Sequence, residues 1–231
     1  MDFLFDSLLS ALKLALSLDE ELLIVVGVSL KVSGISTILA GAIGIPLGLK
    51  VAMSEFRGKR AVITGLNTLL SVPTVVIGLF VYALISRKGI FGPLDLLYTQ
   101  TAMIIGQTML IVPVIGTFTI AAVGRIDERY RKTALSLGAN SRQTAMVIVR
   151  EARFGIATAI IASFGRVISE VGISMMLGGN AKGFTRTMTT AMALEYDKGE
   201  FTLAVALGII LLLISFGLNL GFHVLQGREQ Q

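Results

Sequence analysis

Five segments of this chain are long and apolar enough to cross a lipid bilayer, and no other feature limits the fold as strongly. A membrane-spanning α-helix needs about 20 mostly apolar residues. The five segments lie near residues 31–53, 61–86, 101–123, 154–177 and 201–224. Only 15% of the residues are charged, which excludes a disordered chain and leaves too much apolar surface for one soluble core. We therefore expect an all-α integral membrane protein whose five spans pack as a bundle.

Prolines and glycines inside these segments indicate how the spans pack. Pro73 and Pro113 lie within the second and third segments. Neighbouring helices can satisfy the carbonyl groups that a proline leaves free, so we expect kinked spans there. Gly41, Gly44 and Gly48 recur at helical spacing in the first segment and predict close packing against another helix.

Residues 1–21 predict a different kind of helix, because polar side chains recur there every three or four positions. These residues are Asp2, Asp6, Ser10, Lys13 and Ser17. The spacing gathers them on one helical face, opposite leucine and phenylalanine side chains, which predicts an amphipathic helix in the membrane interface. A sixth span is the alternative, but the acidic residues 19–21 follow too closely. The start carries no positive region, so no cleaved signal peptide is expected.

Basic residues are divided unequally between the two sides of the membrane that five spans define. One side carries twelve, of which four precede the second span, seven lie within residues 124–153 and one is in the C-terminal tail. The other side carries seven. Because cytoplasmic loops are enriched in Lys and Arg, we expect the N-terminus outside and the C-terminus in the cytoplasm. The net charge of +5 is then a topology signal, and no nucleic-acid partner is expected.

The loop of residues 124–153 predicts two helices joined by a sharp turn. Gly138 ends the first, because glycine adopts a positive φ at little cost. Asn140 or Ser141 can cap the second. Composition alone favours a solvated hairpin that only joins two spans.

The spacing within this loop indicates more than a connection. Ala134, Gly138 and Ile148 match the EAA pattern of E-A-A, three residues, G, nine residues, I, one residue and L-P. The chain departs from the pattern at Lys132, at Thr133 and at residues 150–151. On these residues the loop resembles the EAA loop of the permeases of ATP-binding-cassette (ABC) importers.

Further stretches extend the resemblance over nearly the whole chain. They are residues 29–33, 44–48, 56–58, 73–78, 151–153, 165–172, 178–180 and 185–190. Together, in this order, they are most similar to the tungstate-type branch of the molybdate/sulfate-like permeases. The resemblance implies a five-span type I importer permease of the prokaryotic inner membrane, with residues 22–231 as its transmembrane permease domain.

The resemblance also implies partners. Such permeases work as dimers in the membrane lipid, with two cytoplasmic ABC ATPase subunits and an extracytoplasmic substrate-binding protein. The EAA turn enters a groove on the ATPase, which makes Ala134, Gly138, Ala139 and Ile148 the candidate coupling residues. The chain has no G-x-x-x-x-G-K-[ST] phosphate loop. We therefore expect no cofactor in this chain, ATP and Mg in the partner ATPase, and no enzyme activity here.

Arg166 and Glu170 are charged residues that fall well inside an expected span, away from its ends. Four positions apart in a helix, they would share a face. Charges inside a membrane are costly, so they are candidates for function, and the pair could gate an anion path. A structural ion pair that holds helices together is an equal alternative.

Residues 178–190 lie outside by this topology and are rich in hydrogen-bond donors. Asn180, Thr185, Arg186 and Thr187 could contact a tetrahedral oxyanion or the binding protein. Turn-capping threonines are the more common explanation for such a cluster. Gln107, Thr108, Asn67 and Thr68 are expected to join helices rather than bind substrate.

These observations favour the permease subunit of an ATP-driven oxyanion importer, most simply for tungstate. Molybdate or sulfate import by the same kind of machine is the nearest alternative. A channel or carrier that works without an ATPase is more distant. A membrane enzyme would need acid, base or metal-binding residues clustered at one depth, and with no cysteine and a single histidine no metal site is expected.

Overall fold

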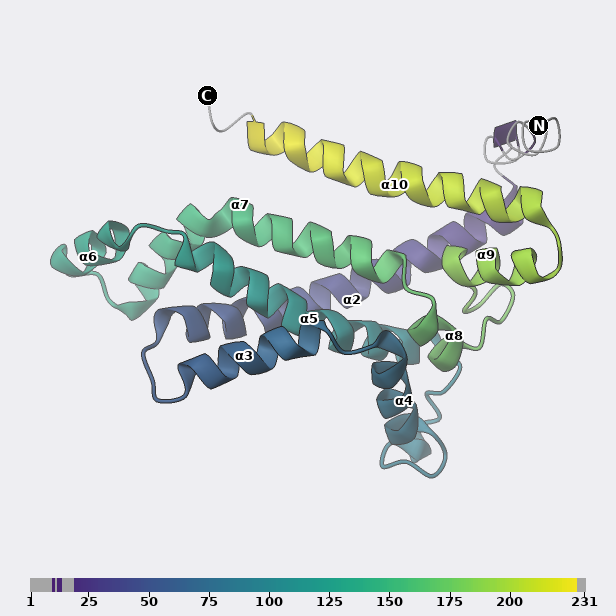
Figure 1. The fold of residues 1–231 in the computed structure, drawn as a ribbon, viewed down its shortest axis with the longest axis horizontal. Helices are drawn as coiled ribbons and strands as arrows, with labels where there is room; N and C mark the ends of the chain where they lie inside the picture. Colours follow the sequence, from purple (N-terminus) through teal and green to yellow (C-terminus); the bar gives the residue numbers. More distant parts are fainter. Residues whose placement is uncertain (1–9, 11, 14–18, 228–231) are drawn as a thin grey trace. The chain divides into compact units, whose positions relative to one another are not determined.

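The computed structural model describes residues 10, 12, 13 and 19–227, and side chains as far as Gly221 (Figure 1). Apart from one short 3-10 helix, the elements of this part are α-helices. They are α2 (Glu20–Met53), α3 (Lys59–Leu70), α4 (Thr74–Ile85), η1 (Gly92–Leu94), α5 (Gln100–Gly124), α6 (Glu128–Ser136), α7 (Ser141–Ile168), α8 (Gly172–Gly178), α9 (Met188–Asp197) and α10 (Phe201–Gly227). The amphipathic helix predicted for residues 1–21 lies almost entirely outside the described residues.

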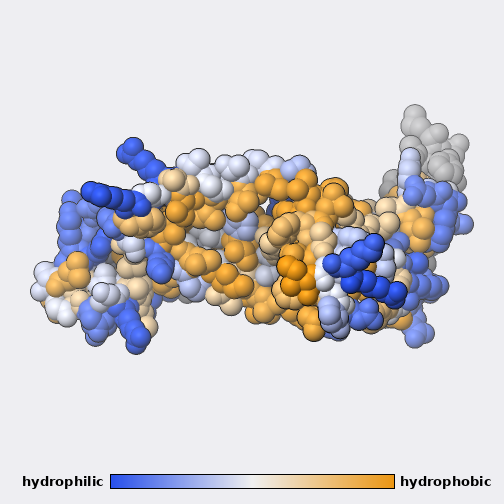
Figure 2. Space-filling view, turned by 90° about the horizontal axis from the view of Figure 1, so that it is seen from below, coloured by the Kyte–Doolittle hydropathy of each residue, from blue (hydrophilic) through white to orange (hydrophobic). Residues whose placement is uncertain are grey.

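The apolar segments appear as three unbroken helices and two broken ones. Three helices, α2, α5 and α10, are long and apolar enough to cross a membrane. The pairs α3–α4 and α7–α8 each reach that length only together and bend at the break between them. If each pair is one span the number is five, as the sequence predicts. Exposed leucine and phenylalanine side chains cover α10, and Figure 2 shows large hydrophobic areas on the surface, as expected for helices in lipid.

The two breaks correct the expectation of continuous spans. Pro73 does not kink a helix but precedes α4 as its N-cap residue, with three residues between α3 and α4. Pro113, in contrast, lies inside an unbroken α5. The first span is the later part of a longer helix, because α2 already begins at Glu20, where the Asp19 carboxylate accepts the backbone N–H groups of Glu21 and Leu22.

The helices divide between two compact units. The first consists of residues 1–36, 73–107 and 165–231. In its core, Gly106 of α5 leaves room for Ile173 and Leu177 of α8, since an added Cβ would lie 2.7 and 2.5 Å from their side-chain atoms. Helix α9 packs against α10 and α8 against α4.

The second unit consists of residues 37–72 and 108–164. The later part of α2 approaches α5 closely at two of the three predicted glycines. A Cβ at Gly44 would lie 3.0 Å from the Val112 carbonyl oxygen, and one at Gly48 would lie 2.7 Å from that of Gly116. Gly41 makes no such approach, since a Cβ there would meet only Ile45 of its own helix.

Candidate functional site

The loop between α5 and α7 forms the predicted helix-turn-helix. Asp127 caps α6, where its carboxylate accepts the backbone N–H of Arg129 at 2.9 Å. At the start of α7 the side chain of Asn140 accepts the N–H of Gln143, and the Gln143 side chain accepts the N–H of Asn140. These reciprocal bonds form a capping box and confirm Asn140 as the cap.

The turn itself is a Schellman motif centred on Gly138. The N–H of Gly138 donates to the carbonyl of Leu135, and the N–H of Ala139 donates to that of Ala134, both at 3.0 Å. Gly138 has a φ of +79°, the left-handed conformation that glycine adopts at least cost. The turn is therefore defined by its own backbone bonds, as the sequence predicts.

The predicted coupling residues differ in how deeply their side chains are buried. Ala134 and Ile148 are buried within this chain, whereas Gly138 is exposed and Ala139 is half-buried at the turn. Leu137, which the motif does not include, is 82% exposed at the turn. A groove of about 540 Å³ lies beside it, lined by residues that include Tyr130, Thr133 and Val147. Tyr130 is also exposed and lines the same groove, and apolar side chains exposed together are typical of a docking surface.

Helix α6 also carries a surface ion pair. Lys132 Nζ lies 2.9 Å from Glu128 Oε2, one helical turn apart. The hydrogen bond from Lys132, and then its charge, lowers the pKa of the Glu128 carboxyl. The same contacts raise the pKa of Lys132. Lys132 stands where the EAA pattern has Glu, so here it stabilises α6 through a pair with Glu128.

Arg166 and Glu170 do not share a helical face, which corrects the prediction. Helix α7 ends at Ile168, so Glu170 lies in the break before α8. Glu170 is 9% exposed, and its carboxylate accepts the backbone N–H of Ile173 at 3.2 Å. Arg166 is exposed, and within the described part of the chain the two side chains form no ion pair. A periodicity argument failed here because the helix does not continue.

Side chains distant in sequence satisfy the polar groups freed at this break. The Nε2 of Gln107 donates to the carbonyl of Val167 at 3.5 Å and to Ser174 Oγ at 3.3 Å, while its Oε1 accepts from Ser36 Oγ. Thr189 Oγ1 donates to the Glu170 carbonyl at 2.9 Å. Backbone groups at membrane depth need such partners. The predicted joining role of Gln107 is thus confirmed, whereas Thr68 bonds only within its own helix.

The side chains in residues 178–190 that were predicted to contact an anion form hydrogen bonds within the protein. Thr185 is fully buried, and its hydroxyl donates to the Gly178 carbonyl at 2.6 Å. Thr187 caps α9 through reciprocal bonds with Thr190. Their hydroxyls hold turns, which is the alternative explanation of the cluster. Asn180, with a φ of +53°, donates from Nδ2 to the Thr190 carbonyl at 3.4 Å.

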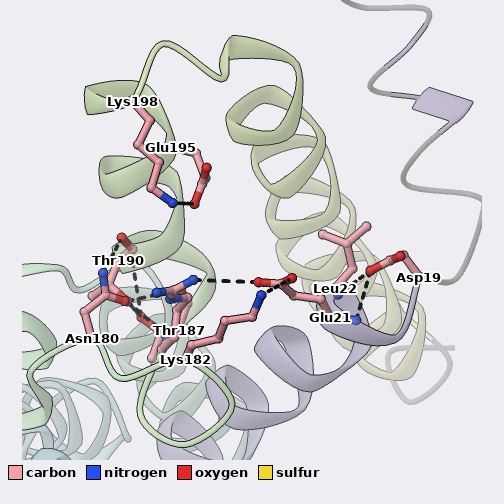
Figure 3. A network of polar contacts seen from close by, with 10 residues as sticks. Asp19, Glu21, Leu22, Asn180, Lys182, Thr187, Thr190, Glu195 and Lys198 are labelled. Atoms are coloured by element: carbon pink, nitrogen blue, oxygen red, sulfur yellow. Dashed lines mark hydrogen bonds and ion pairs between the residues drawn. The ribbon is translucent and has the colours of Figure 1, made fainter.

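Arg186 instead faces the beginning of α2. Its Nη1 lies 3.7 Å from Glu21 Oε1, while Lys182 Nζ lies 2.7 Å from Glu21 Oε2 (Figure 3). The Arg186 side chain is 13% exposed. Glu21 therefore ties the loop before α9 to α2, a link between residues far apart in sequence. No group of side chains able to hold a metal ion is found among residues 19–221.

Comparisons with known proteins agree on one family. Residues 44–230 match the model of the binding-protein-dependent transport system inner membrane component. The chain is 37% identical to the tungstate uptake system permease protein TupB of Peptoclostridium acidaminophilum over 98% of this chain and 99% of that one. It is 41% identical to a probable anion ABC transporter permease protein of Haloferax volcanii, over 84% and 86% of the two chains.

Solved structures share the fold. The MetNI methionine ABC transporter, in an inward-facing conformation, matches with a TM-score of 0.73 at 17% identity over 90% of this chain and 96% of that one. A bacterial ABC transporter that imports alginate matches with a TM-score of 0.77 at 17% identity over 94% and 83%. The chain thus belongs to the family of binding-protein-dependent transport system inner membrane components, and it is the multi-pass permease subunit of an ABC importer rather than an enzyme.

Proposed function

We propose that this permease carries tungstate into the cell. The observation that carries the proposal is the ranking of its relatives. Two tungstate uptake permeases are 37% identical to it over 98% of the chain. Permeases named for molybdenum are 26% identical and one named for sulfate is 23% identical, over shorter stretches. Molybdate and sulfate are the alternatives within the same class.

The helix-turn-helix of residues 124–153 is the proposed docking site for a cytoplasmic ATPase dimer. The rigid turn at Gly138 and the exposed Leu137 beside the groove support this role. ATP and Mg bind in that partner, and two copies of the permease form the path. The ATPase drives alternating access through this loop, and an extracytoplasmic protein delivers the anion.

The excess of basic residues supports an orientation with the N-terminus outside and residues 124–153 in the cytoplasm. In that orientation residues 178–190 face the binding protein. Asn180 and Arg186 keep polar atoms without protein partners, namely Asn180 Oδ1 and Arg186 Nε. Arg186 Nε is a donor and suits an anion, whereas Asn180 Oδ1 only accepts and suits a donor of the binding protein. Thr185 and Thr187 hold turns.

Arg166 and Glu170 act as separate groups in the proposed path. Glu170 holds the break between α7 and α8, where its carboxylate accepts a backbone N–H. Arg166 is exposed near the end of α7 and carries a charge that an anion would meet. We assign the gate to Arg166 and a positioning role to Glu170.

Reconstitution tests the function. The permease, its ATPase and its binding protein are placed in liposomes with Mg-ATP on the ATPase side, and uptake of tungstate, molybdate and sulfate is measured by mass spectrometry of the metal or sulfur. We expect tungstate to accumulate only when ATP and the binding protein are both present. Preferred uptake of molybdate or sulfate would replace tungstate as the substrate. Uptake without the ATPase would favour a carrier.

A further inference from the structure

A pocket of about 450 Å³ lies where α4 ends, and none of the candidate site residues described above lines it. Its lining includes two basic residues, two tyrosines, a serine and one acidic residue. These are Arg87, Lys88, Tyr82, Tyr98, Ser86 and Asp95. Because α4 is the apolar half of a broken span, the pocket lies where a membrane helix gives way to a loop.

The backbone around the pocket is held in a defined shape. The N–H of Phe91 returns to the carbonyl of Leu84 at 2.9 Å, and the N–H of Tyr98 donates to that of Leu177 at 2.8 Å. Asp95 and Tyr98 have φ values of +49° and +63°, which non-glycine residues seldom adopt. Such strain persists only where the surrounding structure imposes it, and it is concentrated at functional sites.

The pocket has the donors that a phosphate group requires. Within the described residues neither Arg87 nor Lys88 forms an ion pair. The hydroxyl groups of Ser86 and the two tyrosines add neutral donors. The single carboxylate, Asp95, leaves a formal charge of +1 on the lining. Guanidinium and ammonium groups bind phosphate through charge-assisted hydrogen bonds.

The surroundings of the pocket are apolar. Ile90 is 80% exposed and Leu94 is 61% exposed in the loop beside it. On α4 the side chains of Leu79 and Phe80 are each more than half exposed. Contact with water is unfavourable for this apolar surface, whereas lipid acyl chains would cover it.

We propose that this pocket binds the phosphate headgroup of an anionic phospholipid, whose acyl chains lie along the exposed face of α4. Tyrosines are favoured at the level of lipid headgroups, and Lys and Arg side chains close to a membrane surface attract anionic lipids. Arg87 and Lys88 fall on the side of the membrane that carries fewer basic residues. The enrichment of Lys and Arg in cytoplasmic loops therefore does not explain their presence there. The site is independent of which anion the permease carries.

A single tryptophan reports on the bound lipid, because the natural chain has none. Phe91→Trp places the reporter in the loop beside the pocket, and Phe216→Trp places it on the exposed face of α10. Each full-length variant is reconstituted in phosphatidylcholine bilayers with 20–30% phosphatidylglycerol (roughly the anionic fraction that gives a marked surface potential). Either the phosphatidylglycerol or an equal amount of phosphatidylcholine carries brominated acyl chains, and quenching by the two is compared.

We expect brominated phosphatidylglycerol to quench Phe91→Trp more strongly, with an enrichment of about fivefold for each basic residue. Phe216→Trp is expected to be quenched equally by both lipids. Replacing Arg87 and Lys88 by Gln abolishes the excess, that is, the stronger quenching of Phe91→Trp by brominated phosphatidylglycerol than by brominated phosphatidylcholine. The same loss of charge at Arg57 and Arg60 preserves this excess. Asp95→Asn increases it.

Three results would overturn the proposal. The first is equal quenching of Phe91→Trp by the two lipids, and the second is an excess that survives the change at Arg87 and Lys88. The third is loss of the excess on addition of submillimolar tungstate or inorganic phosphate, which would identify a site for a small free anion. Each can be read whether or not the reconstituted permease transports tungstate.

Discussion

The backbone N–H of Ala139 donates to the carbonyl of Ala134 at 3.0 Å and closes the turn that joins α6 to α7. This bond requires Gly138, the residue directly before Ala139, to hold a φ of +79°. Nothing lies within 4 Å of the position that a Cβ would occupy there. A side chain at Gly138 therefore meets no steric obstacle, and only the backbone conformation opposes it.

Gly138→Val isolates this conformational cost, which is about 1–2 kcal/mol for a left-handed non-glycine residue. We expect the turn to populate other conformations and the stimulation of ATP hydrolysis by loaded binding protein to fall about 5- to 30-fold. Gly124→Val is the matched control, because that glycine also has open space but no positive φ. Full stimulation in Gly138→Val would contradict a rigid coupling turn.

Leu137→Asp tests the outer surface of the same loop. Leu137 is 82% exposed, so its replacement should change the free energy of unfolding by less than about 0.5 kcal/mol. It should nevertheless reduce the amount of ATPase that co-purifies with the permease. Leu94→Asp is the control, an exposed leucine expected on the opposite side of the membrane. Equal loss of ATPase in both variants would contradict docking at Leu137.

Local chemistry explains what could be predicted from the sequence. The apolar length of the spans and the positive φ of Gly138 depend on nearby residues alone. The break between α7 and α8 is not predicted, because the apolar length of residues 154–177 indicates one continuous span even though Ser169 and Glu170 interrupt it. Its polar groups are satisfied by Gln107 and Thr189, whose proximity only the fold determines. The pairing of Arg166 with Glu170 failed for this reason.

Burial explains the remaining differences between the candidate residues predicted from the sequence and their places in the structure. The EAA pattern identifies Ala134 and Ile148, but both side chains are buried within the chain. Leu137 could be found from the sequence only as an apolar residue next to the turn glycine. The threonines at 185 and 187 carry the donors an anion needs, yet tertiary structure commits them to turns.

Changes at Glu170 separate positioning from charge. Glu170→Gln keeps an oxygen that can accept the N–H of Ile173, so we expect stability near that of the natural protein. Glu170→Ala leaves this buried N–H without its acceptor, at a cost of about 1–3 kcal/mol. Thermal unfolding in detergent measures both. Equal destabilisation by Gln and Ala would show that the charge, not the hydrogen bond, matters.

Arg166→Gln addresses the proposed gate. Because Arg166 is exposed and has no ion pair within the described chain, we expect unchanged stability. Tungstate uptake by the reconstituted complex should fall, while Arg166→Lys should retain part of it because the positive charge remains. Natural uptake in a normally assembled Arg166→Gln complex would remove this residue from the path.

The Glu128–Lys132 pair predicts how α6 responds to pH. The pKa of Glu128 is lowered in the folded loop. Its contribution is therefore present above the ordinary pKa of glutamate, about 4.3, and is lost as pH falls through the lowered value. The pKa of Lys132 is raised, so its contribution is lost only as pH rises through that raised value. Hydrogen-exchange protection of residues 128–136 should be highest between these limits, and Glu128→Gln should remove the acid-side change.

Gln107→Leu tests whether the polar contacts at the break stabilise the membrane domain. Leucine preserves the volume of this buried side chain but removes its bonds to Ser36, Ser174 and the Val167 carbonyl. Interhelical hydrogen bonds in membranes contribute about 0.6 kcal/mol each, so we expect a loss of roughly 2 kcal/mol in the free energy of unfolding in mixed detergent micelles. Asn219→Leu is the control, because Asn219 is exposed and bonds only to Ser215 of its own helix. A Gln107→Leu protein as stable as this control would mean that apolar packing alone maintains the break between α7 and α8.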